Sequence, residues 1–120
     1  MKLSTNFELG KYFTFELSKQ MPIHNWFYYK EGFAPQIVDY AIKQENVAHG
    51  VLFDPFCGCG TSILTAKSQG LKAIGIDISP IAVLASRVKC ENYGATEIEQ
   101  LRSFVSNAKL KEANYDWQFE

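Results

Sequence analysis

The sequence predicts an α/β fold in which helices flank a partial parallel sheet. Two short apolar runs, at 51–54 and 73–77, enclose the glycine-rich turn Gly58-Cys59-Gly60, and a helix-like segment follows each run. Strands that alternate with helices are typical of parallel sheets. A glycine turn after one strand and an acid at the end of the next form the first half of a Rossmann-like nucleotide site. With only two clear strands, we expect part of a larger sheet.

Length and composition limit the function classes. The chain has 120 residues, enough for one domain but not two, and its 47% hydrophobic content allows a packed core. The net charge of −1 gives no basic footprint, so a nucleic-acid partner would have to be bound by a local patch or another chain. Three cysteines without a leader segment predict a reducing, cytoplasmic location, and no apolar run reaches the length of a membrane span.

The first part of the chain is rich in aromatic residues. We expect residues 1–34 to form an aromatic N-terminal arm that lies over the domain of residues 35–120 or against a partner. The alternation at Phe13, Phe15 and Leu17 allows a short strand in this arm. Pro35 suits the first position of a helix over about 35–46, and 51–54 then reads as a short buried strand.

Helix signals continue after the glycine turn. A helix is predicted over 61–68, closed by Gly70 in a left-handed conformation, and Ser79 and Pro80 are the expected N-cap and first residue of the next. That next helix has an apolar stripe predicted to be buried: Ile81, Leu84, Ala85 and Val88. A last helix follows Gly94, with a capping box at Thr96 and Glu99. Its apolar face is Ile98, Leu101, Val105 and Ala108. The basic side chains of Arg87, Lys89 and Arg102 are expected on solvated helix faces.

Two carboxylates suggest what the turn binds. Gly58 and Gly60 would let a ligand approach the backbone without meeting a Cβ atom. Asp54, at the start of the turn, would repel a pyrophosphate but could pair with an α-amino group, which favours S-adenosylmethionine over NAD. Asp77 could accept both hydroxyls of a ribose, and Ile78 could pack on an adenine face. The alternative is an ordinary tight turn with no ligand, which these acids and their spacing disfavour.

At this point the sequence resembles a known family. DPFCGCGT and GIDISP are similar to the cofactor-binding motifs of S-adenosylmethionine-dependent amino-methyltransferases, which include DNA N6-adenine and N4-cytosine methyltransferases and RNA-modifying relatives. The usual form is DPFxGSGT, and Cys59 stands where serine is common. The resemblance covers about residues 24–90 and implies that both motifs bind the cofactor, through Asp54, Pro55, Phe56, Cys57, Gly58, Gly60, Thr61, Asp77, Ile78 and Ser79. The segment 26–38 resembles the one that folds over the methionine end of the cofactor, which implies that Phe33 and Pro35 line that end.

One family feature is missing. The catalytic motif Asp/Asn/Ser-Pro-Pro-aromatic requires adjacent prolines, and the four prolines of this chain are all separate. We therefore predict no catalytic residue in the chain. The resemblance implies the cofactor-binding part of a site-specific DNA methyltransferase of a restriction-modification system. Such an enzyme transfers a methyl group to an exocyclic amine of adenine or cytosine. DNA would be bound through a complementary chain or a missing segment, in a hetero- or homo-oligomer without a membrane.

Several alternatives remain open. The chain could belong to a split enzyme or to a truncated gene. It could be a non-catalytic or remnant interaction domain, or a fragment of an RNA (guanine N2) methyltransferase. An NAD-linked dehydrogenase is disfavoured by Asp54 and by Ile63, which stands at the third glycine position. No metal site is predicted, because the spacing of Cys57 and Cys59 is too tight for a zinc pair.

Overall fold

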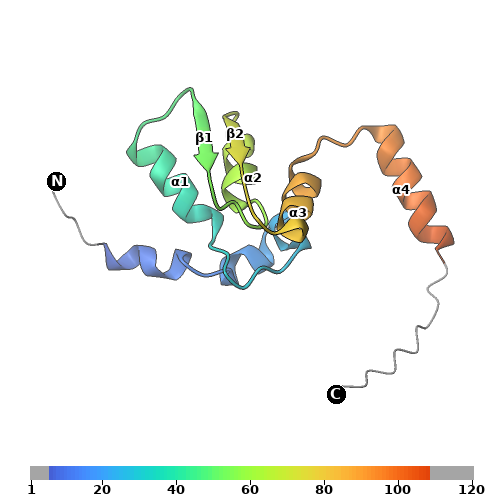
Figure 1. Ribbon diagram of the computed structural model, residues 1–120, viewed down its shortest axis with the longest axis horizontal. Helices are drawn as coiled ribbons and strands as arrows, with labels where there is room; N and C mark the ends of the chain where they lie inside the picture. Colours follow the sequence, from blue (N-terminus) through green and yellow to red (C-terminus); the bar gives the residue numbers. More distant parts are fainter. Residues whose placement is uncertain (1–5, 109–120) are drawn as a thin grey trace, which may run out of the picture.

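A computed structural model describes residues 6–108 and contains a parallel two-stranded sheet with flanking helices (Figure 1). This confirms the predicted fold class; residues 109–120 of the predicted domain lie outside the described residues. The elements in chain order are η1 (Phe7–Tyr12), η2 (Glu16–Gln20), η3 (His24–Trp26), α1 (Pro35–Gln44), β1 (Val51–Asp54), α2 (Thr61–Ser68), β2 (Lys72–Gly75), α3 (Pro80–Cys90) and α4 (Ala95–Asn107), where η denotes a 3-10 helix. Within the described residues, no helix is long and apolar enough to span a bilayer.

The two strands lie side by side, as predicted. In the parallel register, Val51 pairs with Lys72 and Asp54 pairs with Gly75. Helix α2 connects the two strands and packs against both of them. One further bond continues the ladder, because the backbone N–H of Ile76 donates to the Asp54 carbonyl at 2.9 Å. The predicted bounds of β1 are confirmed. β2 begins and ends earlier than the predicted 73–77.

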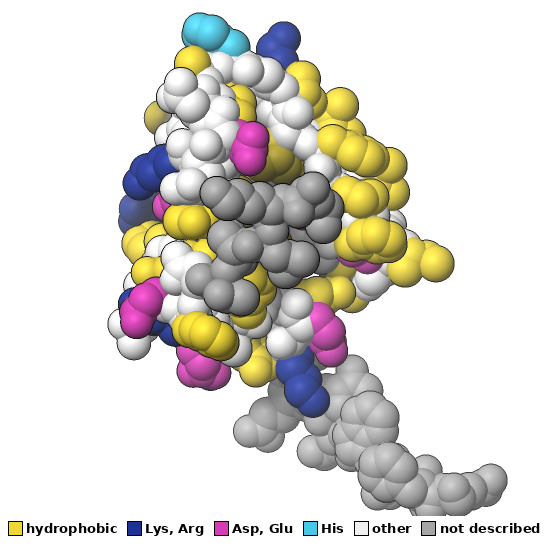
Figure 2. Space-filling view, turned by 90° about the vertical axis from the view of Figure 1, so that its left-hand side faces the viewer, with side chains coloured by type: hydrophobic (Ala, Val, Ile, Leu, Met, Phe, Trp, Pro, Cys, Tyr) yellow, Lys and Arg dark blue, Asp and Glu magenta, His cyan; other side chains and the backbone are white. Residues whose placement is uncertain are grey.

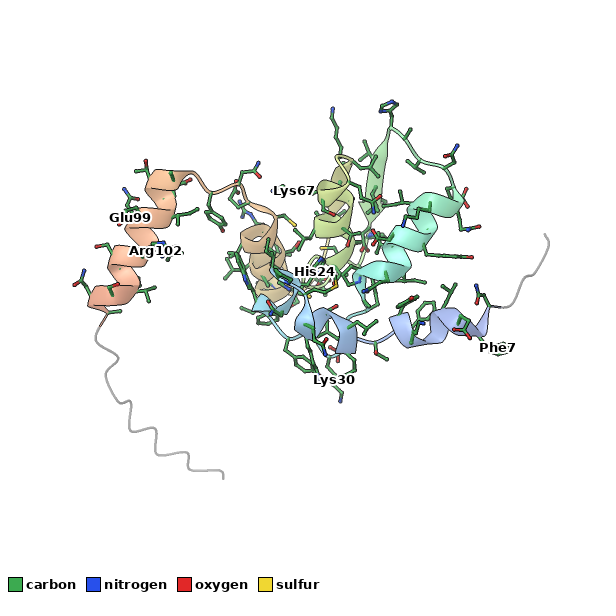
Figure 3. The ribbon with its side chains drawn as sticks, turned by 180° about the vertical axis from the view of Figure 1, so that it is seen from behind. Phe7, His24, Lys30, Lys67, Glu99 and Arg102 are labelled. Atoms are coloured by element: carbon green, nitrogen blue, oxygen red, sulfur yellow. The ribbon has the colours of Figure 1, made fainter. Side chains whose placement is uncertain are left out.

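One face of this sheet is uncovered in the described part of the chain, so the prediction that 51–54 is a buried strand was wrong. Val51 and Phe53 are 55% and 59% exposed, and Ile74 and Ile76 on β2 and just beyond it are 55% and 56% exposed. Hydrophobic side chains accordingly reach the surface along one side of the molecule in Figure 2. The helices α1, α2 and α3 lie side by side in the view from behind (Figure 3), with α2 packed against both strands.

Helix α2 ends, and helix α3 begins, at the predicted signals. Gly70 follows α2 with φ +74°, and the Ser79 hydroxyl accepts the Ala82 N–H at 3.4 Å at the start of α3. The predicted stripe on α3 was wrong, however. Ile81, Leu84 and Val88 are 54%, 57% and 41% exposed, and Ala85 is half-buried. The buried positions are instead Ala82, Ser86 and Lys89, because small side chains at 82 and 86 allow α3 to approach α2 closely.

The last helix stands apart from the other elements in Figure 1. Its N-cap is Gly94, whose N–H donates to the Glu97 carboxylate at 2.8 Å, so the predicted capping box at Thr96 and Glu99 was placed wrongly. None of its residues is buried. The predicted apolar face is therefore present but has no packing partner within residues 6–108.

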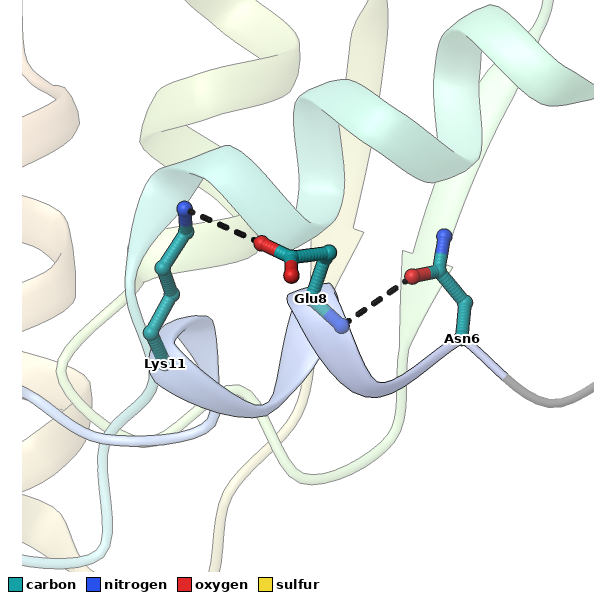
Figure 4. Close-up of polar contacts among 3 residues, drawn as sticks. All are labelled: Asn6, Glu8 and Lys11. Atoms are coloured by element: carbon teal, nitrogen blue, oxygen red, sulfur yellow. Dashed lines mark hydrogen bonds and ion pairs between the residues drawn. The ribbon is translucent and has the colours of Figure 1, made fainter.

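The arm forms 3-10 turns instead of the short strand that the sequence allowed. Asn6 caps η1 by accepting the Glu8 N–H at 3.1 Å, and Lys11 lies 3.9 Å from Glu8 (Figure 4). Phe15 is buried and meets the Tyr28 ring edge-on at 5.4 Å between centroids. Among the described residues the arm contains no strand. Many of its backbone groups bond locally, as between the Ser18 N–H and the Phe15 carbonyl at 3.0 Å, and the Ala34 N–H donates to the Tyr12 carbonyl at 2.8 Å.

Candidate functional site

The loop between β1 and α2 is a tightly bonded turn. The Cys57 N–H donates to the Ile76 carbonyl at 2.9 Å, and the Gly60 N–H donates to the Cys57 carbonyl at 2.8 Å. Gly58 and Gly60 have φ values of +50° and +84°, in the region that favours glycine. The turn thereby brings the N-terminal end of α2 next to the carboxyl ends of both strands.

Both glycines also lie in close contact with other parts of the chain. A Cβ atom on Gly60 would lie 2.4 Å from the Ser86 hydroxyl and 3.0 Å from the Ser86 Cα, so the turn touches α3 directly. A Cβ atom on Gly58 would lie 3.0 Å from the Tyr29 ring, which covers the turn from the arm side. The close approach predicted for a ligand is therefore used, at Gly60, for packing between two helices.

Asp54 is oriented by the turn that follows it. One carboxylate oxygen accepts the Phe56 N–H at 3.0 Å, and the other accepts the hydroxyl hydrogen of Ser62 on α2. Asp54 is half-buried. An ionised carboxylate offers about four acceptor sites, so a further donor can still bind it.

Asp77 joins the end of β2 to both the turn and the next helix. Its oxygens accept the Gly58 N–H and the Ser79 N–H, each at 2.8 Å. These backbone donors, Ser79 first and Gly58 second, hold the pKa of the Asp77 carboxyl below its usual value. Asp77 therefore stays ionised at neutral pH, with one acceptor site on each oxygen directed elsewhere.

The two carboxylates make the site negative. Burial, followed by the nearby Asp54 and Asp77, raises the pKa of the Cys57 thiol. Desolvation, and then Asp77, raises the pKa of Tyr29. Within residues 6–108, neither carboxylate forms an ion pair; the pairs found there, Lys11 with Glu8 and Lys19 with Glu16, both lie in the arm. Such a site favours a ligand that carries positive charge.

A small pocket lies on the arm side of the turn. Its lining residues are Tyr29, Glu31, Gly32, Phe33, Phe56, Cys57, Gly58, Cys59 and Thr61. Two apolar side chains beside the turn are largely bare: Phe56 is 84% exposed and Ile78 is 99% exposed. Exposed apolar groups next to charged acceptors suit an amphipathic ligand.

The structure brings together part of the predicted residue set. Phe33, Phe56, Cys57, Gly58 and Thr61 line one pocket, and Asp54 and Asp77 lie at the ends of neighbouring strands. The remaining predicted residues have other positions: Pro35 begins α1, Gly60 caps α2 and lies against Ser86, Ser79 caps α3, and Pro55 and Ile78 are exposed. The cofactor-binding role of each residue stays a prediction.

Sequence reasoning missed several members of the site. Tyr29, Glu31, Gly32 and Cys59 line the pocket, and Ser62 holds Asp54. Tyr29 belongs to an aromatic run, but nothing in a one-dimensional pattern shows which aromatic ring faces the turn. For Ser62 a signal existed. It lies in the first turn of α2, directly after the loop that Asp54 begins.

A buried lysine attaches the arm to α3. Lys89 was expected on a solvated face, which was wrong: it is 4% exposed, and its ammonium donates to the carbonyls of His24 and Phe27 at 3.0 and 3.4 Å. It also lies 6.0 Å from the centroid of the Phe15 ring. His24, which is labelled in Figure 3, is also buried, and burial, followed by the Lys89 charge, lowers the pKa of His24 to about 4. Lys89 thus anchors the arm segment that leads to Tyr29.

Comparison with known proteins identifies relatives over part of their length. No protein-family model and no solved structure matches the chain. Type II methyltransferase M.BsoBI of Geobacillus stearothermophilus is 42% identical over 80 residues, which are 66% of this chain and 16% of that protein. Type II methyltransferase M.MjaII of Methanocaldococcus jannaschii is 33% identical over 97 residues, 81% of this chain and 18% of that protein.

A third relative is named as a tRNA methyltransferase. The tRNA (guanine(10)-N2)-dimethyltransferase of Methanothermobacter thermautotrophicus is 30% identical over 87 residues, 72% of this chain and 26% of that protein. The chain therefore spans about a quarter or less of each of these three relatives. These matches confirm the resemblance, and the chain belongs to the amino-methyltransferase family.

Proposed function

We propose that the chain binds S-adenosylmethionine and is the cofactor-binding part of a DNA amino-methyltransferase. One observation carries the proposal: Asp54 and Asp77 stand at the carboxyl ends of paired strands, and neither forms an ion pair within residues 6–108. S-adenosylmethionine carries a sulfonium and an α-ammonium group, so a doubly anionic site complements its charge. A dinucleotide, with its anionic pyrophosphate, would be repelled there.

Each residue has a distinct binding task in this proposal. Asp54 accepts hydrogen bonds from the α-ammonium group, and Ser62 keeps the carboxylate in place. Asp77 accepts the ribose hydroxyls through the acceptor sites that Gly58 and Ser79 leave free. Ile78, which is 99% exposed, packs on the adenine, and Phe33 and Phe56 border the methionine end.

The bound cofactor would supply a methyl group made electrophilic by the neighbouring sulfonium. The task of this chain is alignment: holding the donor still so that an acceptor amine can meet it in line. We propose that the acceptor is an exocyclic amine of adenine or cytosine, flipped from the duplex. The residues that hold this base come from another segment or chain, since no adjacent prolines occur in this sequence.

Calorimetric titration with S-adenosylmethionine tests the proposal. We expect wild type to bind, and Asp77→Ala to bind roughly tenfold to hundredfold more weakly, the loss typical of hydrogen bonds to a charged group. Asp39→Ala is the matched control, because Asp39 is a half-buried carboxylate on α1 that bonds Gln69 away from the turn. Equal affinity of wild type and Asp77→Ala would remove Asp77 from the site. Thermal protection by NAD but not by S-adenosylmethionine would contradict the proposal as a whole.

The tRNA relative supports a second candidate, in which the acceptor is guanine N2 of RNA. Transfer of labelled methyl groups, assayed on duplex DNA and on tRNA after addition of a complementing methyltransferase part, separates the two candidates. Cofactor binding without transfer to either would instead support a non-catalytic interaction domain.

A further inference from the structure

Two of the three cysteines share a pocket on the side of the glycine turn that faces α3. The pocket has a volume of about 170 Å³, and its lining residues are Cys57, Ile63, Gly75, Val83, Ser86, Arg87 and Cys90. Cys57 belongs to the turn, and Cys90 is the last residue of α3. The third cysteine, Cys59, lines the pocket on the arm side instead. All three are free thiols, so nothing covalent joins the turn to α3.

Ser86 lies between the two thiols of this pocket. A Cβ atom on Gly60 would lie 3.0 Å from the Ser86 Cα, so Ser86 touches the turn. Ser86 and Cys90 are four positions apart on α3, and side chains at this spacing share one helix face, with Cβ atoms about 5–6 Å apart. Burial raises the pKa of the Cys90 thiol and Cys57 adds to that rise, while the Ser86 hydroxyl opposes the rise at both thiols. The two sulfurs therefore lie near one another, on either side of one small side chain.

Cys90 is the thiol that a dissolved reagent can meet. It is half-buried, whereas Cys57 is 8% exposed. Positive groups surround Cys90, because the Lys67 ammonium donates to its carbonyl and Arg87 lines the same pocket. Burial is the larger influence on the pKa of this thiol, and the Lys67 charge opposes it. Partly exposed thiols in positive surroundings are the reactive ones, and these charges favour an anionic reagent.

We propose that Cys90 and Cys57 form a thiol–disulfide exchange site for an anionic, low-molecular-weight disulfide such as oxidised glutathione. The Cys90 thiolate attacks one sulfur of the reagent, and one glutathione thiolate leaves. The Cys57 thiolate then attacks the Cys90 sulfur of the mixed disulfide, and the second glutathione leaves. Two protein thiols are oxidised to one disulfide, the reagent is reduced to two thiols, and the two protons pass to them. In a reducing compartment such a disulfide is transient and acts as a redox sensor.

The disulfide would disturb the candidate site, because forming it moves the turn. Bonded sulfurs lie about 2.05 Å apart, so the free Cys57 sulfur must move toward α3. In the reduced chain this sulfur rests against the end of β2, since a Cβ atom on Gly75 would lie 2.8 Å from it. The next residue, Gly58, donates the N–H that holds Asp77. Resting on the function proposed above, we expect oxidation to weaken S-adenosylmethionine binding at least tenfold.

Thiol mapping on the full chain tests the exchange site. The chain is equilibrated with graded ratios of reduced to oxidised glutathione at about pH 8, where more of each thiol is ionised, and mass spectrometry then locates linked and alkylated cysteines. We expect a disulfide between Cys57 and Cys90 that excess reduced glutathione reverses. Cys57→Ser should stop at the glutathione adduct on Cys90, and Cys90→Ser should form neither adduct nor disulfide. Cys59→Ser is the matched control and should form the same disulfide as wild type.

Calorimetric titration with S-adenosylmethionine measures the consequence. Oxidised wild type should bind at least tenfold more weakly than reduced wild type, and the same oxidation should leave the affinity of Cys90→Ser unchanged. Circular dichroism checks that each variant is folded, and the mapping of wild type needs no variant. The inference is overturned by a disulfide that involves Cys59, by no disulfide at any ratio, or by a linked chain with full affinity. A reduced chain that binds no cofactor defeats only the proposed function, because the mapping decides the exchange site independently.

Discussion

A comparison of two glycines in the left-handed conformation distinguishes the effect of steric crowding at the turn from the effect of backbone strain. Gly60 and Gly70 have φ values of +84° and +74°, but a Cβ atom on Gly70 would meet nothing within 4 Å, whereas one on Gly60 would lie 2.4 Å from the Ser86 hydroxyl. Alanine in this conformation costs about 1–2 kcal/mol, and overpacking adds about 1–3 kcal/mol. We therefore expect Gly70→Ala to lower the free energy of unfolding by about 1–2 kcal/mol, and Gly60→Ala to lower it by about 2–5 kcal/mol.

Urea denaturation followed by circular dichroism measures both losses. The cause of the difference is tested by the double variant Gly60→Ala/Ser86→Gly, in which the hydroxyl and Cβ of residue 86 no longer oppose the new methyl group. The Cα of residue 86, at 3.0 Å, remains, so relief should be partial, with a coupling free energy of about 1 kcal/mol or more. Equal losses in Gly60→Ala and Gly70→Ala, or strict additivity in the double variant, would refute direct packing of the turn on α3.

Two further predictions concern the attachment of the arm. His24 is buried with a pKa of about 4, against an ordinary value of 6.5. Between these two pH values the unfolded chain binds a proton at this imidazole and the folded chain does not. The free energy of unfolding should therefore have its full value above pH 6.5 and fall by at most about 3 kcal/mol as the pH drops to 4. His24→Gln should flatten that part of the pH profile measured by urea denaturation, and an unchanged slope would contradict a buried neutral imidazole. Lys89→Met removes two hydrogen bonds to arm carbonyls and should lower the free energy of unfolding by about 1.5–3 kcal/mol, with faster amide exchange around residues 24–29. Lys43→Met, at an exposed lysine, is the control. Equal exchange rates in the two variants would argue against Lys89 as an anchor of the arm.

Features determined by neighbouring residues were predictable from the sequence. The ends of β1 and α2, the left-handed Gly70 and the Ser79 cap each depend on a few adjacent positions. The adjacency of Asp54 and Asp77 was also predictable, because a short crossover places consecutive parallel strands side by side. Local rules therefore recovered the framework of the candidate site.

Features determined by distant contacts were not predictable. The bond between Lys89 and the His24 carbonyl joins residues 65 positions apart, and the strand allowed at Phe13–Leu17 had no partner to pair with. For α3, periodicity found an apolar stripe correctly but could not show which face meets α2. The close contact of Ser86 with Gly60 decides that face, and a small residue at position 86 carries no hydrophobic signal.

The apolar stripes that the structure leaves exposed share one cause. They form the open sheet face and the outer side of α3, and their largest members are Val51, Phe53, Ile74, Ile76, Ile81, Leu84 and Val88. Completing the burial of these half-exposed side chains would contribute on the order of 5–10 kcal/mol, at about 1.5–3 kcal/mol for each full burial. That is comparable with the net stability of a whole domain. The hydrophobic pattern therefore matches an assembly larger than the described part of the chain, in which strands beside β1 and a layer over the open face bury what residues 6–108 leave exposed.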